Sequence, residues 1–301
     1  MIIEPLVFSP DLQVPAALTS DDDSTAFEDT EGQRVVARAC REGDWCWLWL
    51  DGTGSYRFPA VATTGTLRAE VVPDPGASRA RAHDDYYRSL APVALQVYGY
   101  EALHGTAVMG EGGALVLLAP SRSGKTTLAC ELVERGHRLV ADDAVVLEVP
   151  ADPRAVPVLR PLPFVPRLRD DSAARYGLPV RDKTVVTAEV GLGDPVPLAG
   201  FVMLDRRADF AAPCLARLGP STALKALLSR CYFHHSSTDD DRQRKLVAAY
   251  LRVAAGAPVY ELSYPDGYDR LAETADLLQA ECLGREPLSR GQLAQRAALG
   301  V

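Results

Sequence analysis

The feature that most constrains the fold is a short loop that joins an apolar segment to a helical one. Residues 114–118 form an unbroken apolar run, which is typical of a strand buried on both faces of a parallel sheet. Residues 119–127 follow, with the sequence Ala-Pro-Ser-Arg-Ser-Gly-Lys-Thr-Thr. Apolar residues then recur at helical spacing as far as Gly136, a residue type that commonly ends helices. A strand, this loop and a helix, in that order, predict a phosphate-binding loop.

The chemistry of such a loop assigns roles to its residues. Backbone N–H groups converge on phosphate oxygens at the helix N-terminus, where the helix dipole also favours an anion. We expect Lys125 to reach the β- and γ-phosphates and the Thr126 hydroxyl to bind Mg²⁺. The first position of the motif, usually glycine, is Ala119, which is small enough to be tolerated. The predicted nucleotide-binding residues are Ser121, Arg122, Ser123, Gly124, Lys125, Thr126 and Thr127. A helix start of this composition without any ligand is the alternative.

Two adjacent aspartates end the next predicted strand. Residues 138–141 form this strand, Asp142 and Asp143 follow it, and residues 144–149 resume an apolar, β-branched run. Ligands of open α/β sheets bind at the carboxyl ends of strands, so we expect both carboxylates beside the loop. Phosphoryl transfer needs one carboxylate for the metal and often a second to orient or deprotonate the acceptor. A solvated turn between two strands is the alternative.

These segments together resemble a known family. The motifs are Leu103-His104-Gly105, then Gly124-Lys125-Thr126, then residues 131–143 with the sequence Glu-Leu-Val-Glu-Arg-Gly-His-Arg-Leu-Val-Ala-Asp-Asp. They are similar to the kinase domain of HPr kinase/phosphorylase and its relatives. The resemblance implies an α/β fold with a P-loop kinase core, related to ATP-dependent phosphoenolpyruvate carboxykinase. It also implies a kinase that phosphorylates a serine hydroxyl, with ATP and Mg²⁺ as cofactors.

The resemblance also implies roles for individual residues. Lys125 and Thr126 would bind phosphate and Mg²⁺. One of Asp142 and Asp143 would act as the general base and the other would assist the metal; the sequence leaves the order open, and we provisionally place Asp143 with Thr126 at the metal. His104 would lie near the γ-phosphate. The catalytic set implied in this way is His104, Lys125, Asp142 and Asp143.

The chain also departs from the parent family. Thr126-Thr127 stand where the family usually has Ser-Glu, and the downstream Glu-Ile-Arg-Gly-Leu-Gly signature of the phosphorylase activity has no clear counterpart. Residues 178–262 match only in their general rhythm. Closer in size and style are the HPr-kinase-like proteins of peptide natural-product pathways, including lasso-peptide tailoring kinases, which phosphorylate a serine of a precursor peptide.

Composition excludes several classes of function. The formal charge of −8 and the lack of a basic stripe argue against nucleic acid as a partner. No apolar run reaches the roughly 18 residues of a membrane helix, and the first residues do not resemble a signal peptide. The six cysteines are scattered without metal-binding spacing, so free thiols and a cytoplasmic location are expected. These cysteines are Cys40, Cys46, Cys130, Cys214, Cys231 and Cys282.

The chain divides by pattern into three parts. Residues 1–95 are predicted to form a small, mainly β module with a connecting helix, residues 96–288 the kinase domain and residues 289–301 a tail. The helix is expected over residues 80–100, with Pro92 kinking it or starting a second helix. Downstream, strands are predicted at 184–190, 198–204 and 258–262, and helices at 220–230, 239–255 and 269–283.

Several other residues are weaker candidates. Trp45, Trp47 and Trp49 share one face of a predicted strand, either as a docking face for a substrate or, as we favour, as core. His234 and His235 could mark a metal site, but a loop before a helix fits better. His83-Asp84-Asp85 are expected at a helix start, where acidic residues favour the dipole. Cations that could stabilise a transferring phosphoryl group, or simply be surface charges, are Lys183, Arg206, Arg207 and Arg230.

Three functions are compatible with these patterns. The first is an ATP- and Mg²⁺-dependent phosphotransferase that acts on a serine of a peptide or protein, of the precursor-peptide or HPr type. The second is a kinase of a small hydroxylated metabolite, which would show the same motifs. The third is a nucleotide-binding regulatory module without catalysis. A homo-oligomer is compatible with each of them.

Overall fold

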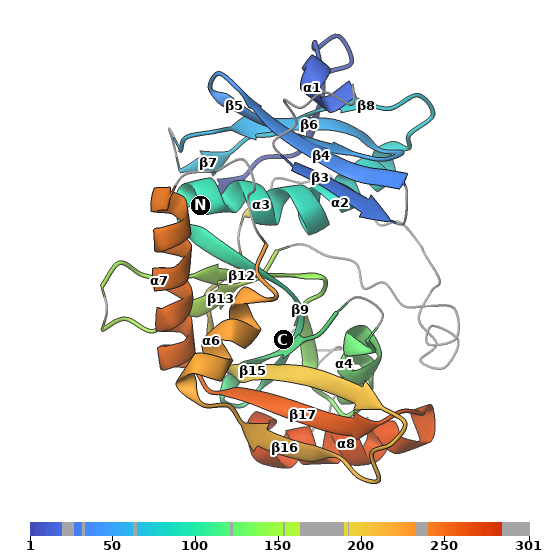
Figure 1. The fold of residues 1–301 in the computed structure, drawn as a ribbon, viewed down its shortest axis with the longest axis vertical. Helices are drawn as coiled ribbons and strands as arrows, with labels where there is room; N and C mark the ends of the chain where they lie inside the picture. The colour runs from blue at the N-terminus through green and yellow to red at the C-terminus, as the bar shows by residue number, and fades with distance from the viewer. Residues whose placement is uncertain are drawn as a thin grey trace, which may run out of the picture.

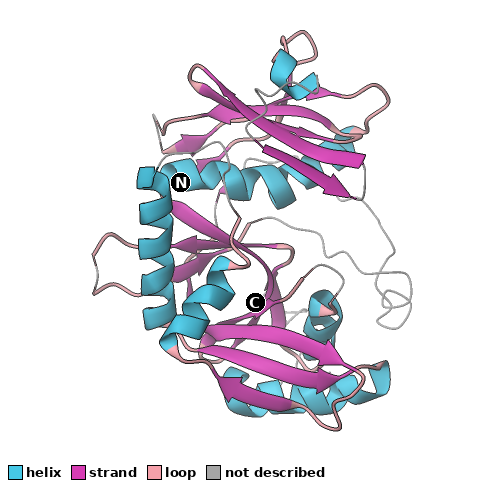
Figure 2. Ribbon diagram, viewed as in Figure 1, coloured by secondary structure: helices cyan, strands magenta, loops and turns pink. Residues whose placement is uncertain are grey.

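The computed structural model describes residues 1–19, 27–31, 34–62, 65–120, 123–152, 154–162, 190–191, 193–232 and 240–284. Within these ranges the protein has a mixed α/β fold, as predicted. Figure 1 shows one sheet in the upper part of the molecule, a larger one in the lower part and a helical segment between them. The same alternation of strand and helix layers is visible in Figure 2.

The upper sheet is built from the first part of the chain. Its neighbouring strands are antiparallel, except for the first pair, and it has the order β2-β8-β6-β5-β4-β3. The strands are β2 (Val7–Phe8), β3 (Phe27–Glu31), β4 (Arg34–Glu42), β5 (Trp45–Leu50), β6 (Gly54–Pro59) and β8 (Glu70–Pro73). Beside it, a small sheet contains β1 (Ile2–Ile3), β7 (Thr66–Leu67) and β14 (Val190–Gly191).

Of the three tryptophans of β5, Trp47 is a core residue, as we favoured, whereas Trp45 and Trp49 are partly buried. Trp47 is buried with Leu18 and Cys40, and the side chains of Trp45 and Trp49 pack against this cluster. The short helix α1 (Ala16–Thr19) supplies Leu18, so it covers this face of the sheet. The face is therefore closed by the protein's own chain.

A helical segment follows the upper sheet and leads into the lower one. Ser78 caps its start by accepting a hydrogen bond from the Arg81 N–H at 3.1 Å, and Gly99 ends it with a φ of 85°. Pro92 stands in the first turn of a new helix, directly after a π-helical turn. The segment consists of α2 (Arg79–Asp85), η1 (Tyr86–Leu90), α3 (Ala91–Leu95) and η2 (Gln96–Tyr98).

The position of residues 83–85 corrects one prediction. His83, Asp84 and Asp85 occupy the last turn of α2, so the expectation of a helix start was wrong. The helix begins earlier, at Arg79, because Ser78 provides the cap. Asp84 and Asp85 therefore lie near the following π-helical turn, where Asp84 pairs with Arg88.

The lower sheet has eight strands and carries the predicted loop. Its order is β10-β9-β12-β13-β15-β17-β16, with β11 also paired to β9 and β10 also paired in parallel to β15. The long strand β9 thus pairs with three partners. The strands are β9 (Tyr100–Gly110), β10 (Gly113–Leu118), β11 (Arg138–Ala141), β12 (Ala144–Glu148), β13 (Val158–Arg160), β15 (Val196–Arg207), β16 (Cys214–Arg217) and β17 (Val259–Pro265).

Helices cover both faces of this sheet, and β10 contributes side chains to each face. Leu115 and Leu117 pack in a cluster with α4 and α8, whereas Val116 and Leu118 pack in a second cluster with α6 and α7. This alternation explains the unbroken apolar sequence of β10. The helices are α4 (Lys125–Glu134), α6 (Pro220–Leu228), α7 (Asp240–Gly256), η3 (Tyr268–Arg270), α8 (Leu271–Leu278) and η4 (Gln279–Leu283).

One buried cluster connects the upper sheet to the lower one. It contains Tyr56 and Phe58 of β6, Tyr86 of the helical segment, Val146 of β12, and Tyr232. Side chains of the first hundred residues therefore pack against strands that flank the predicted site.

Two further sequence-based expectations can be compared with the described residues. All six cysteines are free thiols, as predicted. None of the described helices is both long and apolar enough to span a membrane. Residues 184–189 of the predicted strand lie outside the described residues, and so do His234, His235 and the predicted tail at 289–301.

Candidate functional site

The predicted loop lies between β10 and α4. Gly124 precedes α4 with a left-handed φ of 88° and provides no side-chain cap. A Cβ at this position would lie 3.3 Å from Arg206 Nη1 and 3.4 Å from Tyr264 Oη, so both side chains contact the loop. The Tyr264 hydroxyl is also 3.3 Å from the Ser123 carbonyl oxygen, to which it donates. The remaining predicted loop residues, Ser121 and Arg122, lie outside the described residues.

Lys125 folds back over the loop. Its Nζ donates to the carbonyl oxygens of Ala119 and Pro120, at 2.9 Å each. Burial lowers the pKa of Lys125, while the negative charges of Asp143 and Asp142 act in the opposite direction. The ammonium group is thus held in the loop, close enough to both aspartates to respond to their charge.

Asp142 is buried against the start of α4. Asp142 is 2% exposed. Its Oδ1 accepts hydrogen bonds from Thr126 Oγ1 at 3.0 Å and from Thr106 Oγ1 at 2.9 Å. We had paired Thr126 with Asp143; the structure instead brings Thr126 to Asp142. Asp142 therefore links the end of β11 to the start of α4.

Asp143 turns away from its neighbour. It has a φ of 65°, a left-handed conformation that Asp tolerates better than most residues. Its carbonyl oxygen accepts from the Gly105 N–H at 3.1 Å, and its carboxylate, 45% exposed, pairs with Arg88. The two adjacent carboxylates consequently face different partners.

His104 lies on β9 beside this pair. Its ring stacks on Tyr232 with a centroid distance of 3.6 Å, and its backbone N–H donates to the Arg230 carbonyl oxygen at 2.7 Å. Burial is the main cause that lowers the pKa of His104 to about 4, and the charges of Lys125 and Arg230 act in the same direction. The carboxylate of Asp143 opposes this shift. The imidazole is therefore neutral near pH 7.

Two of the four cations considered from the sequence lie at the site. Arg206 contacts the loop at Gly124, and the charge of Arg230 acts on both His104 and Lys125. The Arg230 Nε is buried without a partner among the described residues. Arg207, by contrast, forms ion pairs of 3.7 and 3.4 Å with carboxylates of its own strand end and the following turn. Lys183 lies outside the described residues.

Three residues at the site were not predicted: Arg88, Thr106 and Tyr232. Thr106 lies two residues after His104 on the same strand, so strand alternation could have placed it on the same face. Arg88 and Tyr232 come from segments distant in sequence, and no motif marks them. Both contact Asp143: Arg88 through its guanidinium and Tyr232 through its hydroxyl, which lies 3.4 Å from the Asp143 carbonyl oxygen.

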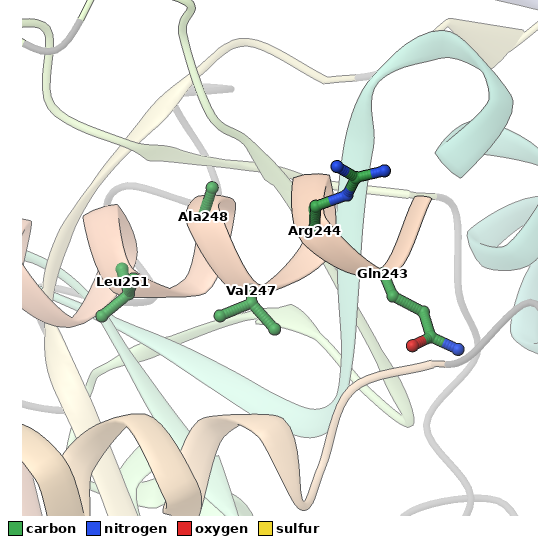
Figure 3. A pocket seen from close by; sticks show the side chains of 5 residues that line it. All are labelled: Gln243, Arg244, Val247, Ala248 and Leu251. Atoms are coloured by element: carbon green, nitrogen blue, oxygen red, sulfur yellow. The ribbon is translucent and has the colours of Figure 1, made fainter. Parts of the chain in front are cut away.

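An open depression of about 690 Å³ lies elsewhere, on the outer face of α7 (Figure 3). None of the described residues that line it belongs to the predicted site. These residues are Gln243, Arg244, Val247, Ala248 and Leu251.

Comparison with known proteins gives short but clear matches. No family model matches the chain. Over 48 residues it is 52% identical to the HPr kinase/phosphorylase of Prosthecochloris aestuarii (strain DSM 271 / SK 413), a segment that covers 16% of this chain and 14% of that protein. Over 43 residues it is 56% identical to the HPr kinase/phosphorylase of Caldanaerobacter subterraneus subsp. tengcongensis, which covers 14% of each protein.

A segment of the chain is thus similar to HPr kinase/phosphorylases. The resemblance inferred from the motifs is confirmed over the 48 and 43 residues of the two alignments. Each aligned segment spans about 14% of the relative's length. The structure of the Hpr(Ser) kinase/phosphatase from Coxiella burnetii aligns over 66% of this chain and 94% of that chain, with 13% identity and a TM-score of 0.31.

Proposed function

We propose that this HPr kinase-like protein is an ATP- and Mg²⁺-dependent phosphotransferase that acts on a hydroxyl group, a serine of a peptide or protein. The observation that carries the proposal is the divergence of the two aspartates. Asp142 binds Thr126 at the start of α4, whereas Asp143 pairs with Arg88 and its charge acts on both His104 and Lys125. Phosphoryl transfer requires two such functions, one for the metal nucleotide and one for the acceptor.

The residues of the loop fit a metal nucleotide. The N-terminus of α4 follows a left-handed glycine without a side-chain cap, which suits a bound phosphate. The ammonium of Lys125 and the guanidinium groups of Arg206 and Arg230 supply positive charge. The Thr126 hydroxyl and the Asp142 carboxylate are hard oxygen ligands, which Mg²⁺ prefers.

This arrangement revises the expected division of labour. Asp142, which already binds Thr126, is assigned to the metal, and Asp143 to the acceptor. When bound, Mg²⁺–ATP supplies the phosphoryl group to be transferred. Asp143 accepts the proton of the attacking hydroxyl, while Lys125 and Arg230 stabilise negative charge on the loop side. His104, neutral near pH 7, serves as a hydrogen-bonding group rather than a charge.

The acceptor class follows from the named relatives and from the chain's organisation. Proteins similar to the loop segment are named for HPr, a protein acceptor, so a peptide or protein serine is the closest analogy. We assign nucleotide handling to residues 96–288 and acceptor recognition to residues 1–95. A precursor peptide of a natural-product pathway is the acceptor we propose first.

A transfer assay tests this function. The full chain is incubated with Mg²⁺ and γ-labelled ATP on an array of serine-containing peptides, and serine phosphorylation is the expected result. Label on small hydroxylated metabolites alone would support a small-molecule kinase. Tight nucleotide binding without any labelled acceptor or released phosphate would indicate a non-catalytic module. Lys125→Ala is expected to abolish binding and transfer together, because the ammonium contacts phosphate throughout the reaction.

A further inference from the structure

Arg88 connects the helical segment to the acceptor side of the site. It lies in the π-helical turn η1 and is 5% exposed. Its Nη1 pairs with Oδ2 of Asp143, and its Nε donates to Oδ1 of Asp84 at 2.8 Å. Single π-helical turns change the direction of the side chains that follow and occur frequently at functional sites. The guanidinium is thereby held between two carboxylates.

The same two residues are fixed from a second side by Tyr232. Its hydroxyl donates to the Arg88 carbonyl oxygen at 2.9 Å and lies 3.4 Å from the Asp143 carbonyl oxygen. Its own carbonyl oxygen accepts from Gln96 Nε2 at 2.5 Å. Arg88 and Asp143 are therefore linked through Tyr232 and do not form an isolated pair.

The contact is specific in geometry. Arg88 engages Oδ2 of Asp143, and among the described contacts no partner engages Oδ1, which belongs to a carboxylate that is 45% exposed. The ion pair contributes little net stability through the buried guanidinium, because removing that charge from water is costly. A buried arginine that binds a half-exposed carboxylate at the proposed acceptor side instead suits a role in orientation.

We propose that Arg88 is a positioning residue that acts through Asp143. It fixes one carboxylate oxygen so that the other faces the acceptor hydroxyl. This inference rests on the proposed function, because it assumes that Asp143 receives the acceptor's proton. It means that the segment before residue 96, which contains no catalytic motif, provides part of the acceptor side of the active site.

Arginine is required by this geometry. Its planar group can bind Asp84 through Nε and Asp143 through Nη1 at the same time, whereas a lysine ammonium at this site would keep one contact well and the other poorly. The conservative variant is therefore expected to retain part of the function. If Arg88 acted only through packing, the charge of a lysine at this position would not preserve part of the function.

The test measures transfer by the full chain from γ-labelled Mg²⁺–ATP to serine-containing peptides and to water. We expect Arg88→Met to lower kcat by about 10²-fold, a typical effect of a misplaced reacting group. The Kd for Mg²⁺–ATP, measured by calorimetry, should change by less than about twofold, because Asp142 and Lys125 are untouched. Arg88→Lys should give an intermediate kcat. Arg81→Met is the matched control, since Arg81 lies on the same helical segment and pairs with Asp85 but not with Asp143.

A double-mutant cycle distinguishes action through Asp143 from independent action. In an Asp143→Asn background, Arg88→Met should have almost no further effect on kcat, since residues that act as a unit are non-additive. An undiminished loss in that background would overturn the inference. So would full kcat in Arg88→Met.

The remaining outcomes are also decisive. If Arg88→Met does not fold, Arg88→Lys and Asp84→Asn replace it. Both variants should lower kcat without weakening Mg²⁺–ATP binding. Unchanged kcat in both would overturn the inference. If the unmodified chain binds Mg²⁺–ATP but neither labels a peptide nor releases phosphate, the proposed function fails and this inference fails with it. A failure confined to the Arg88 variants leaves the proposed function intact.

Discussion

The loop side and the acceptor side of the site are assembled in different ways. The loop side brings together Lys125, Thr126 and Asp142, and these three residues are close in sequence: Thr126 and Asp142, which are hydrogen-bonded, are 16 positions apart. The acceptor side depends on Asp143 and on its partners Arg88 and Tyr232. Arg88 is 55 positions from Asp143 in the sequence, and Tyr232 is 89 positions from it. When one half of a site is built from a single strand–loop–helix–strand unit, that half can recur in other proteins as a unit. A half built from distant segments depends on the whole fold.

This difference fits the pattern of similarity. The matches to HPr kinase/phosphorylases are confined to 48 or 43 residues, a length sufficient for the loop side but not for the contacts of Arg88 and Tyr232. The acceptor side is therefore where this protein has room to differ from its relatives.

The largest effect is expected from removing the upper sheet. A chain that starts at Ala80 loses the part of the shared cluster that includes Tyr56 and Phe58 and exposes Tyr86 and Leu90. Each fully buried side chain of this size contributes roughly 1.5–3 kcal/mol, and a domain is stable by only about 5–15 kcal/mol. We expect no cooperative thermal unfolding and no Mg²⁺–ATP binding. A soluble fragment that binds nucleotide normally would show that the two regions are independent.

The two aspartates should then separate kinetically. Asp143→Asn is expected to lower kcat by about 10²–10⁴-fold, the usual contribution of a general base, with nearly unchanged nucleotide affinity. Asp142→Asn should instead raise the Mg²⁺ concentration required for activity. Steady-state rates over a Mg²⁺ titration measure both. The reverse pattern would instead place Asp143 at the metal.

The sequence predicted what depends on local pattern. The strand before the loop, α4, β11, β12 and the helices α6, α7 and α8 follow from periodicity and end signals, and the loop places Lys125 beside Asp142. The sequence could not decide which aspartate faces Thr126, because the two are identical and adjacent. Only the left-handed backbone of Asp143 separates them.

The long-range contacts were beyond such reasoning. Strand β9 was missed, because residues 100–110 contain glycine and polar residues and their partners come from three other strands. Arg88 was read as part of an ordinary amphipathic helix, and nothing in a helical pattern indicates a π-helical turn. The acidic residues 84 and 85 were misplaced for a related reason: the Ser78 cap starts the helix one turn earlier.

A smaller effect is expected for the Tyr232 hydroxyl. Tyr232→Phe leaves the Arg88 carbonyl oxygen without this donor and should cost about 1–3 kcal/mol of unfolding free energy. Tyr250→Phe is a matched control, because the buried Tyr250 hydroxyl donates in the same way to Ala102 O at 2.8 Å. We expect similar shifts of the denaturant midpoint for both, but a lower kcat only for Tyr232→Phe. Equal kcat values would separate Tyr232 from the acceptor side.

A further effect concerns pH. Burial first of all lowers the pKa of His104 to about 4, and it also lowers the pKa values of His83 and His137 below the usual 6.5. Between about pH 6.5 and 4, the unfolded chain therefore binds protons at these histidines. In the same pH range His104 of the folded protein stays unprotonated. It follows that stability should fall as the pH is lowered through this range and should not change from this cause above pH 7.

His104→Gln tests this linkage at the boundary between the two sides. The variant cannot bind the proton in either state, so its unfolding free energy should fall less steeply with decreasing pH than that of the unmodified protein. Urea unfolding at a series of pH values between 7 and 4 measures the two slopes. His137→Gln, whose residue binds Met109 O at 3.3 Å and lies away from the aspartates, is the matched comparison. If both variants flatten the curve but only His104→Gln changes kcat, the ring of His104 belongs to the reaction as well as to the fold; unchanged slopes for both would contradict neutral histidines at these sites.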